Sequence, residues 1–346
     1  MKYIKRLFFI FLMLVCISFD AFGSGQNRAG TAAAPQLRIP VGSRYLAMGG
    51  ADVALVSGLE AIFWNPAGVS ISETDANAIF SYRQYIADMS MNFVAISGKF
   101  GEFGTIGLSF RSLNIGDINV TTMDQPDGNG QIINPSFFIA GLTYSKQLSD
   151  RISIGVNFNL INESWPGVSA TGFSLDAGVQ YRNLFSVPNL SLGVTVKNLG
   201  APMEYGGTAL FVQGEEQTGT RGTTFYEVSA QSAELPSEIS LGVSYTRNID
   251  DENLLTVAGT FVNNNYTYDN YKAGLEYSYK NILYVRGGYL FAPESTDDTP
   301  NIFEDYTVGA GLNFKEFTNI DVSVDYAYIP VKFFDANNVF SISLGL

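Results

Sequence analysis

Residues 40–70 read PVGSRYLAMGGADVALVSGLEAIFWNPAGVS, a stretch in which the large apolar residues do not alternate as they would in a β-strand. Apolar positions such as Tyr45, Leu46 and Met48 instead recur at mixed steps of three and four, interrupted by glycines. That spacing predicts one or two short helices. Because the much longer remainder of the chain looks like sheet, we expect this segment to lie as a plug inside a barrel.

The remainder, residues 75–346, follows a period of two. Residues 152–161 show it most clearly, with isoleucine, valine, phenylalanine and leucine alternating with serine, glycine and asparagine. This places every large apolar side chain on one face of a strand. Fourteen such segments are present, each about as long as a tilted strand that crosses the hydrocarbon layer. The sequence therefore predicts an all-β fold, a fourteen-stranded antiparallel transmembrane β-barrel with a short N-terminal helical plug.

The connections between these segments alternate in length. Membrane barrels have short periplasmic turns at one end and longer external loops at the other. With an even number of strands, we expect both chain ends on the periplasmic side. The longer or more polar links, assigned to the outside, are residues 116–134, 164–170, 200–234, 263–269 and 293–303.

The composition agrees with a membrane barrel. Charged residues make up 15% of the chain and aromatic residues 14%, whereas soluble domains usually carry about a quarter charged residues. No apolar run after residue 23 is long enough for a helical membrane span. A formal net charge of −13, without a basic stripe, argues against a nucleic-acid partner.

Residues 1–23 have the pattern of a secretory signal peptide. Three basic residues precede an apolar run, and Ala21-Phe22-Gly23 fits the small-x-small rule for cleavage. Cys16 follows valine rather than a small residue, which makes lipid attachment there the less favoured alternative. We therefore expect Sec-dependent export, a plug segment over residues 24–74 and a barrel over residues 75–346.

Two short motifs in the plug segment point to a family. Met48-Gly49-Gly50-Ala51 is followed, after thirteen intervening residues, by Asn65-Pro66-Ala67-Gly68. Together they resemble the amino-terminal region of the PorV/PorQ family of outer-membrane proteins, which belongs with the FadL-like fourteen-stranded barrels. The resemblance implies an N-terminal hatch built on these motifs, with Met48, Gly49, Gly50, Asn65, Pro66, Ala67 and Gly68 as its motif residues.

The resemblance leaves two functions open. PorV/PorQ-type members are associated with the type IX secretion system of the Bacteroidetes, where the barrel binds cargo or machinery proteins. FadL-like members carry hydrophobic small molecules such as fatty acids or hydrocarbons across the outer membrane, which would require an apolar pocket, here lined by Leu46, Met48, Phe63 and Trp64. The long loop of residues 200–234 favours protein docking because it is polar and acidic, with Glu204, Glu215, Glu216, Glu227 and Glu234.

Enzymatic chemistry finds little support. The chain has no histidine, and its only cysteine lies in the leader, which excludes Ser-His-Asp and Cys-His pairs and an ordinary zinc site. Asp321 and Asp325 share a strand face at a backbone separation of roughly 13 Å, too far apart for a glycosidase pair. Residues 124–130 lack the closing glutamate of a calcium loop. We expect a non-enzymatic protein without cofactor or metal.

Charged residues on the inward positions of the predicted strands are the remaining candidates. Both signs occur, so the side chains can pair with one another around the plug, and we favour this over a selectivity filter. The predicted lumen charges are Lys99, Arg111, Asp176, Arg182, Lys197, Lys272, Glu276, Arg286, Lys315, Asp321 and Asp325.

Overall fold

The computed structural model describes residues 28, 30–214, 224–293, 302–303, 305–318 and 320–346. The expected signal peptide of residues 1–23 lies outside them. Over the described residues, fourteen strands form one closed antiparallel barrel, which confirms the predicted barrel and its strand number. The barrel strands are β1 (Ala76–Gln84), β2 (Ser90–Lys99), β3 (Thr105–Asn114), β6 (Ser136–Gln147), β7 (Ile152–Trp165), β8 (Val168–Arg182), β9 (Leu190–Leu199), β12 (Glu238–Asn248), β13 (Asn253–Asn264), β14 (Asn270–Tyr279), β15 (Leu283–Phe291), β16 (Tyr306–Asn313), β17 (Asp321–Ile329) and β18 (Asn337–Gly345).

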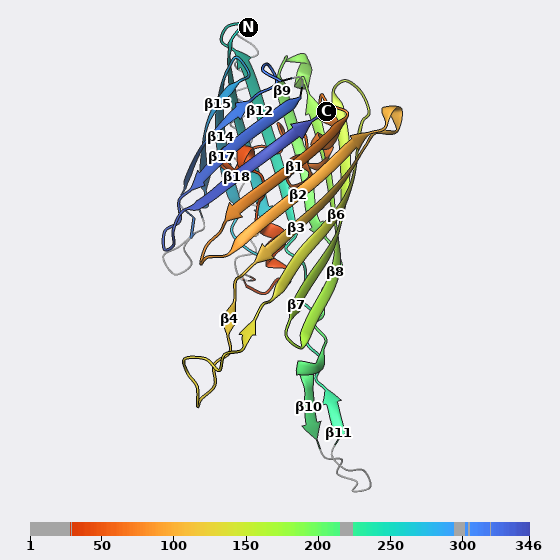
Figure 1. The fold of residues 1–346 in the computed structure, drawn as a ribbon. Coiled ribbons are helices and arrows are strands. Elements are labelled where there is room, and N and C mark those ends of the chain that lie inside the picture. Colours follow the sequence, from red (N-terminus) through yellow and green to blue (C-terminus); the bar gives the residue numbers. More distant parts are fainter. Residues whose placement is uncertain (1–27, 29, 215–223, 294–301, 304, 319) are drawn as a thin grey trace.

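The two ends of the barrel differ in their connections. Neighbouring barrel strands pair along the chain, and β1 pairs with β18 to close the sheet. One end, which we call the short-turn end, carries the C-terminus and compact links such as residues 148–151 and 249–252 (Figure 1). The other, the long-loop end, carries the links of residues 115–135 and 200–237, whose described parts extend well beyond the barrel (Figure 1).

Each of these two long links contains a small hairpin. In the first, β4 (Ile118–Asn119) pairs with β5 (Ile132–Ile133), and in the second β10 (Phe211–Gly214) pairs with β11 (Thr224–Glu227). The prediction for residues 164–170 was wrong, because they are not a loop. Trp165 pairs directly with Val168, and Gly167, at a φ of +75°, makes the turn between β7 and β8.

Burial follows the predicted alternation. Along β7, Ser153, Asn157 and Asn159 are buried, whereas Val156 and Phe158 expose 43% and 46% of their surface on the outer face. The outer face of a membrane barrel meets lipid, so exposed apolar side chains there need no further protein partner. Among the described residues, no helix is long and apolar enough to cross a membrane.

Residues 30–75, the N-terminal segment, lie within the ring of strands (Figure 1). The segment contains two α-helices of four residues each and two 3-10 helices of four and six residues; its glycines and its Asn65-Pro66 step prevent longer helices. These elements are η3 (Pro35–Arg38), α2 (Ser43–Leu46), α3 (Ala61–Trp64) and η4 (Pro66–Ile71). Most side chains of the segment are buried and form the main apolar cluster of the molecule.

The N-terminal segment runs through the barrel from one end to the other. At its start, Arg28 donates from Nη2 to the carboxylate of Glu234 at 2.6 Å and to the hydroxyl of Tyr266 at 2.6 Å, both in links of the long-loop end. At its finish, Asp75 N donates to Leu346 O at 2.9 Å, at the short-turn end. The described part of the segment therefore runs from the long-loop end to the short-turn end. The N-terminus itself lies outside the described residues, so the expectation that both chain ends lie on the same side stays a prediction.

Candidate functional site

The inner wall of the barrel is shaped to receive the backbone of the N-terminal segment. At several inward positions only glycine fits, because a Cβ atom there would come closer than 3.0 Å to an atom of the segment. At Gly288, for example, it would lie 2.0 Å from the backbone N of Gly49. These positions are spread over six strands: Gly155 (β7), Gly178 (β8), Gly193 (β9), Gly274 (β14), Gly288 (β15) and Gly309 (β16).

Asn65 of the predicted motif joins the segment to the wall. Its side chain is fully buried, and its amide Nδ2 donates to Val53 O at 2.7 Å and to Val179 O of β8 at 3.2 Å. Its Oδ1 accepts from Ala67 N at 3.2 Å, capping η4, which begins at Pro66. Every polar atom of this side chain thus has a backbone partner, so Asn65 links the Asn-Pro-Ala motif both to the rest of the segment and to β8.

The Met48-Gly49-Gly50 motif ends α2 at the opposite wall. Gly49 and Gly50 have φ angles of +70° and +73°, which L-residues with a side chain rarely adopt. Nearby, Thr307 Oγ1 of β16 donates to Ala47 O at 3.0 Å. This motif therefore turns the chain sharply where it meets β15 and β16.

The four residues predicted to contact a hydrophobic ligand lie together in the packed interior. Leu46, Met48, Phe63 and Trp64 expose at most 7% of their surface and belong to one apolar cluster. The Phe63 and Trp64 rings meet edge to face at 4.9 Å between centroids, and Trp64 Nε1 donates to Val41 O at 3.1 Å. All four side chains pack against other residues of the protein interior.

Three cations from three different strands surround that aromatic pair. Lys197 Nζ of β9 lies 4.1 Å from the Phe63 centroid, and the Arg111 guanidinium of β3 lies 5.3 Å from it. Lys272 Nζ of β14 lies 5.6 Å from the Trp64 ring. A cation over an aromatic face is stabilised by the ring quadrupole, more strongly when desolvated. These three predicted lumen charges thus contact the N-terminal segment, and Lys197 also pairs with Glu238 at 2.7 Å.

A second group of predicted lumen charges forms a chain of ion pairs. Arg286 of β15 donates to Glu276 of β14 at 2.6 Å and to Asp325 of β17 at 2.5 Å. Glu276 also accepts two hydrogen bonds from Arg44 of α2, at 2.9 and 3.1 Å. The order Arg44, Glu276, Arg286, Asp325 alternates in sign, so each buried charge has an opposite neighbour. Sequence reasoning missed Arg44, because it lies in the segment rather than on a strand.

The other predicted lumen charges are not part of that chain. Asp176 accepts from Asn157 and Asn159 at 3.0 and 2.9 Å. Lys315 pairs with Glu73 at 2.8 Å and lies 3.9 Å from Asp321, in an exposed position at the short-turn end. Lys99 is exposed, and Arg182 is half-buried.

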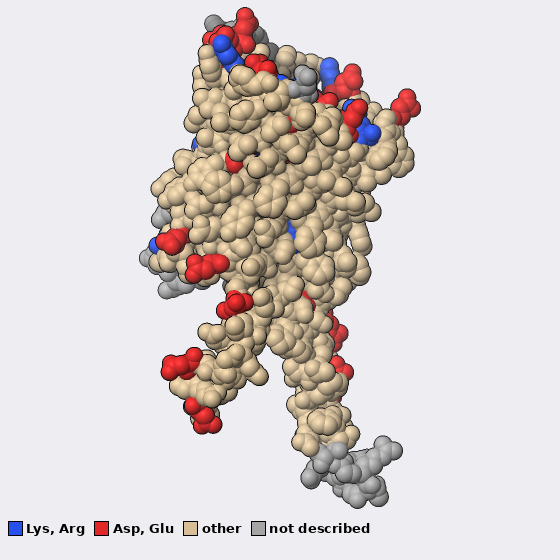
Figure 2. Space-filling view, viewed as in Figure 1, with Lys and Arg blue, Asp and Glu red and all other residues tan. Residues whose placement is uncertain are grey.

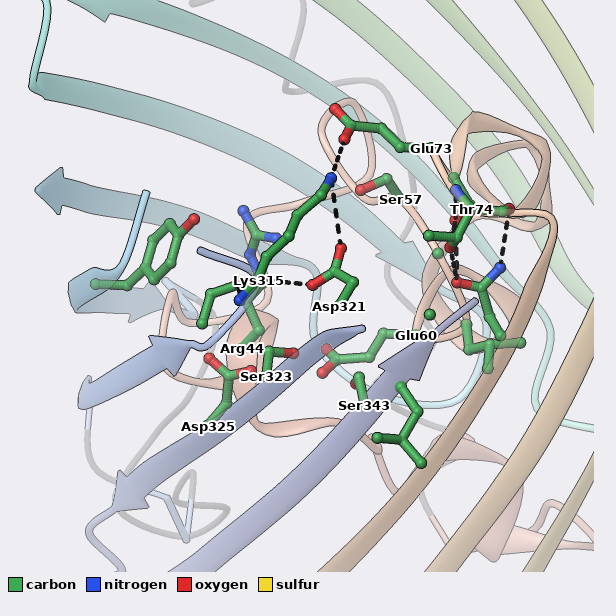
Figure 3. Close-up of a pocket in the computed structure, with 18 of the residues that line it drawn as sticks. Arg44, Ser57, Glu60, Glu73, Thr74, Lys315, Asp321, Ser323, Asp325 and Ser343 are labelled. Carbon is green, nitrogen blue, oxygen red and sulfur yellow. Dashed lines mark hydrogen bonds and ion pairs between the residues drawn. The ribbon is translucent and has the colours of Figure 1, made fainter. Parts of the chain in front are cut away.

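A cavity of about 620 Å³ opens between the N-terminal segment and the strands near the closure of the barrel (Figure 3). It lies toward the short-turn end, since it is lined by the first residues of β1 and β17 and the last residues of β16 and β18. The four residues predicted to contact a hydrophobic ligand do not line it. Its charged lining residues, among those described, are Arg44, Glu60, Glu73, Arg286, Lys315, Glu316, Asp321 and Asp325.

Two carboxyl groups of the N-terminal segment have raised pKa values. Burial, and to a smaller extent the Asp325 carboxylate, raise the pKa of Glu60 to about 8 against the lowering effects of Arg44 and Arg286. Burial raises the pKa of Asp52 to about 7, against the lowering effect of Lys272. Sequence reasoning missed both residues, because a carboxylate in an irregular segment gives no periodic signal of its burial.

The long-loop end carries the other candidate surface. Phe211, Val212, Phe225 and Tyr226 of the β10–β11 hairpin are exposed, each by 45% or more. The described parts of residues 115–135 and 200–237 contain no lysine or arginine, and acidic side chains dot both projecting hairpins in Figure 2. Of the acidic residues predicted here, Glu204 and Glu227 are exposed, Glu234 is paired with Arg28, and Glu215 and Glu216 lie outside the described residues.

The base of the second hairpin is fixed to the barrel. Met203 and Ala233 bridge each other, Ser169 of β8 bridges Gly206, and Ala209 N donates to Gly167 O at 3.0 Å. Met203 and Leu235 also pack in an apolar cluster with Leu37 and other residues of the N-terminal segment. The hairpin therefore projects from an ordered base.

Residues 22–183 match the family model described as type IX secretion system protein PorV. The resemblance to the PorV family is confirmed. Among solved structures, this chain has the fold of the Pseudomonas putida toluene transporter TodX, with a TM-score of 0.55 at 11% identity over 87% of this chain and 96% of that one. A Pseudomonas aeruginosa FadL homologue gives 0.54 at 14% identity, over 88% and 98%.

The CymD monoaromatic hydrocarbon channel gives a TM-score of 0.52 at 12% identity, over 88% of this chain and 96% of that one. At these sequence identities the likeness between these proteins and this chain concerns the fold alone. A search of curated proteins finds no significant match.

Proposed function

We propose that this chain is a non-enzymatic outer-membrane barrel that serves type IX secretion as a docking or shuttle component. Its partners would be secretion-system proteins or their cargo, which bind at the long-loop end. The observation that carries the proposal is the pair of projecting hairpins, which present apolar and acidic side chains, the second of them from a base fixed to the barrel. Apolar exposed patches with a charged surround are typical of protein-binding surfaces.

The N-terminal segment acts, in this proposal, as a fixed plug. Gly155, Gly288 and the other inward glycines bring its backbone into direct contact with the wall, and Asn65 and Arg44 bond it to strands on different sides of the barrel. The predicted lumen charges then anchor the plug rather than select a solute. Residues 24–74 would form the plug and residues 75–346 the barrel.

The outer face of the sheet supports the proposed location. Its exposed apolar side chains, such as Val156 and Phe158, require lipid as their solvent. We propose that the protein resides in the outer membrane after Sec-dependent export directed by residues 1–23. The long-loop end faces outward and the short-turn end faces the periplasm.

Truncation of the second hairpin tests the docking function. Residues 209–228 are replaced by a short Gly-Ser turn, which leaves the bridge between Met203 and Ala233 in place. We expect an intact barrel that no longer co-purifies with secretion partners and no longer supports cargo delivery to the cell surface. A matched truncation within the β1–β2 turn, residues 85–89, serves as the control. Normal secretion with the shortened hairpin would contradict the proposal.

Transport of hydrophobic molecules is the second candidate. It is favoured by the shared fold with proteins named as a toluene transporter and a monoaromatic hydrocarbon channel. In that case Leu46, Met48, Phe63 and Trp64 would contact the solute. Replacing Met48 and Trp64 by alanine would then alter uptake of an apolar compound while secretion stays normal. If the docking function is right, the same variant weakens the packing of the plug and leaves uptake unchanged.

A further inference from the structure

The cavity near the short-turn end is not used by the docking function, and its charges are unbalanced. Among the described residues, five carboxyl side chains and three cationic side chains line it. The carboxyl groups are those of Glu60, Glu73, Glu316, Asp321 and Asp325. The lining therefore has a surplus of negative charge, which attracts cations into a confined space.

All three cations of the lining already have carboxylate partners. Arg286 pairs with Glu276 and Asp325, and Arg44 pairs with Glu276. Lys315 pairs with Glu73 at 2.8 Å. An anionic ligand would have to compete with these pairs, so the cavity is poorly suited to an anion.

Glu60 is the lining carboxyl group that lacks a counter-ion although it is buried. Only 6% of the residue is exposed, and no described cation lies within ion-pair distance of it. Its one hydrogen bond comes from Tyr45 N at 3.5 Å, the outer limit for such a bond. A buried carboxyl group without a good partner is costly and calls for an explanation.

The surroundings of Glu60 offer further oxygen acceptors. In Figure 3 the carboxyl group of Glu60 lies near the labelled side chains of Ser323 and Asp325, which belong to β17, and of Ser343, which belongs to β18. No hydrogen bond of the described residues involves the hydroxyl of Ser323 or Ser343, although both line the cavity. The described residues contain no cluster of three or more His, Cys, Asp or Glu side chains that could hold a metal ion.

We propose that this cavity binds an organic cation, a primary ammonium or guanidinium group, with Glu60 as its counter-ion and Ser323 and Ser343 as hydrogen-bond acceptors. Ammonium and guanidinium groups are donors without acceptors, which matches a lining of unused oxygen atoms. A cavity of about 620 Å³ is within the range of ligand sites. The cation can belong to a free diamine or to a lysine or arginine side chain of a peptide.

Calorimetry on the purified full-length barrel in detergent tests the site. The probes are putrescine as the free diamine and a blocked pentapeptide with two lysines, each compared with its acetylated form. We expect Glu60→Gln to lower the affinity for the bound probe at least tenfold, because it removes the counter-ion but keeps the shape. The control is Glu252→Gln, at an exposed position outside the cavity, which changes the affinity less than twofold. Binding of putrescine alone identifies a free amine as ligand, and binding of the peptide alone identifies a side chain.

A proton count provides a second readout. Glu60 faces Asp325 on β17, Arg44 on α2 and Arg286 on β15, and burial raises its pKa to about 8. Binding of a cation at pH 7 therefore releases a proton from Glu60, which two buffers of different ionisation enthalpy reveal, and Glu60→Gln abolishes the release. The proposal is overturned if neither probe binds at millimolar concentration, if the acetylated forms bind equally, or if the affinity is the same in wild type and Glu60→Gln.

Discussion

Two adjacent glycines on β15 allow a direct test of the fit between segment and wall. Gly288 points inward, and a Cβ atom there would lie 2.0 Å from Gly49 N and 2.2 Å from the carbonyl carbon of Met48. Gly287 points outward, and its Cβ atom would meet nothing closer than the carbonyl of Thr307 at 4.0 Å. Gly288→Ala and Gly287→Ala therefore add the same methyl group to opposite faces of one strand.

The expected difference in stability between the two variants follows from these distances. Overpacking typically costs about 1–3 kcal/mol, and Gly288→Ala should reach the upper value because both clashing groups are backbone atoms. Replacing glycine by alanine also stabilises by about 0.4–1 kcal/mol through the unfolded state. We therefore expect Gly288→Ala to lower the free energy of unfolding by about 2 kcal/mol and Gly287→Ala to raise it by up to about 1 kcal/mol. The two variants should differ by about 3 kcal/mol.

Equilibrium unfolding by urea in lipid vesicles measures this difference. Fluorescence is informative because Trp64, one of only two tryptophans, lies in the N-terminal segment. Heat-modifiable migration on gels reports separately whether the barrel is closed. Equal unfolding midpoints for the two variants, or a lower midpoint for Gly287→Ala, would refute the inward fit of the segment.

Three further predictions address topology and charge. Thr31→Cys should react with a membrane-impermeant maleimide on intact cells, whereas Asp250→Cys should react only after lysis. The reason is that Thr31 lies at the long-loop end of the barrel and Asp250 at the short-turn end. The reverse labelling pattern would overturn the proposed orientation of the barrel in the membrane. Glu60→Gln should reduce the pH dependence of stability, because the pKa of Glu60 is about 8 in the folded protein and 4.5 in the unfolded chain. Between these two pH values the free energy of unfolding of the wild type should fall by about 1.4 kcal/mol per pH unit relative to the variant. Parallel stability profiles of the two proteins from about pH 5 to 9 would contradict this prediction. Arg286→Leu should lower the free energy of unfolding by about 3–5 kcal/mol, because it leaves buried Asp325 without its partner and Glu276 with Arg44 alone. Lys280→Leu, in an exposed pair, should lower it by less than about 1 kcal/mol; similar unfolding midpoints would argue against the network.

The barrel could be predicted because its two faces meet different solvents. Along β7, lipid on one side and a polar interior on the other force an alternation that is visible in residues 152–161. Where hairpins leave the membrane, this constraint ends. Residues 164–170 looked like a loop because Ser164, Pro166 and Gly167 are turn-forming, yet β7 continues to Trp165 before the turn. A local pattern does not record how far a hairpin extends.

The interior could be predicted only in part. Inward positions of Glu276, Arg286 and Asp325 followed from strand parity, but their pairing depends on the register of four strands and was not readable. Arg44, which completes the chain, and Glu60 lie in a segment without periodicity. Strand parity also places Gly288 inward with Arg286, but nothing in the sequence shows that the backbone of the N-terminal segment lies against it.

The cations around Phe63 bear on which function the interior permits. An aliphatic chain that displaced the Phe63 and Trp64 rings would leave Arg111, Lys197 and Lys272 against apolar carbon, which is costly for buried charges. A small aromatic molecule could present its own ring to the same cations and recover part of the lost stabilisation. Passage of a fatty chain through this region is therefore disfavoured more strongly than passage of an aromatic solute. A docking protein, whose plug stays in place, keeps all three contacts.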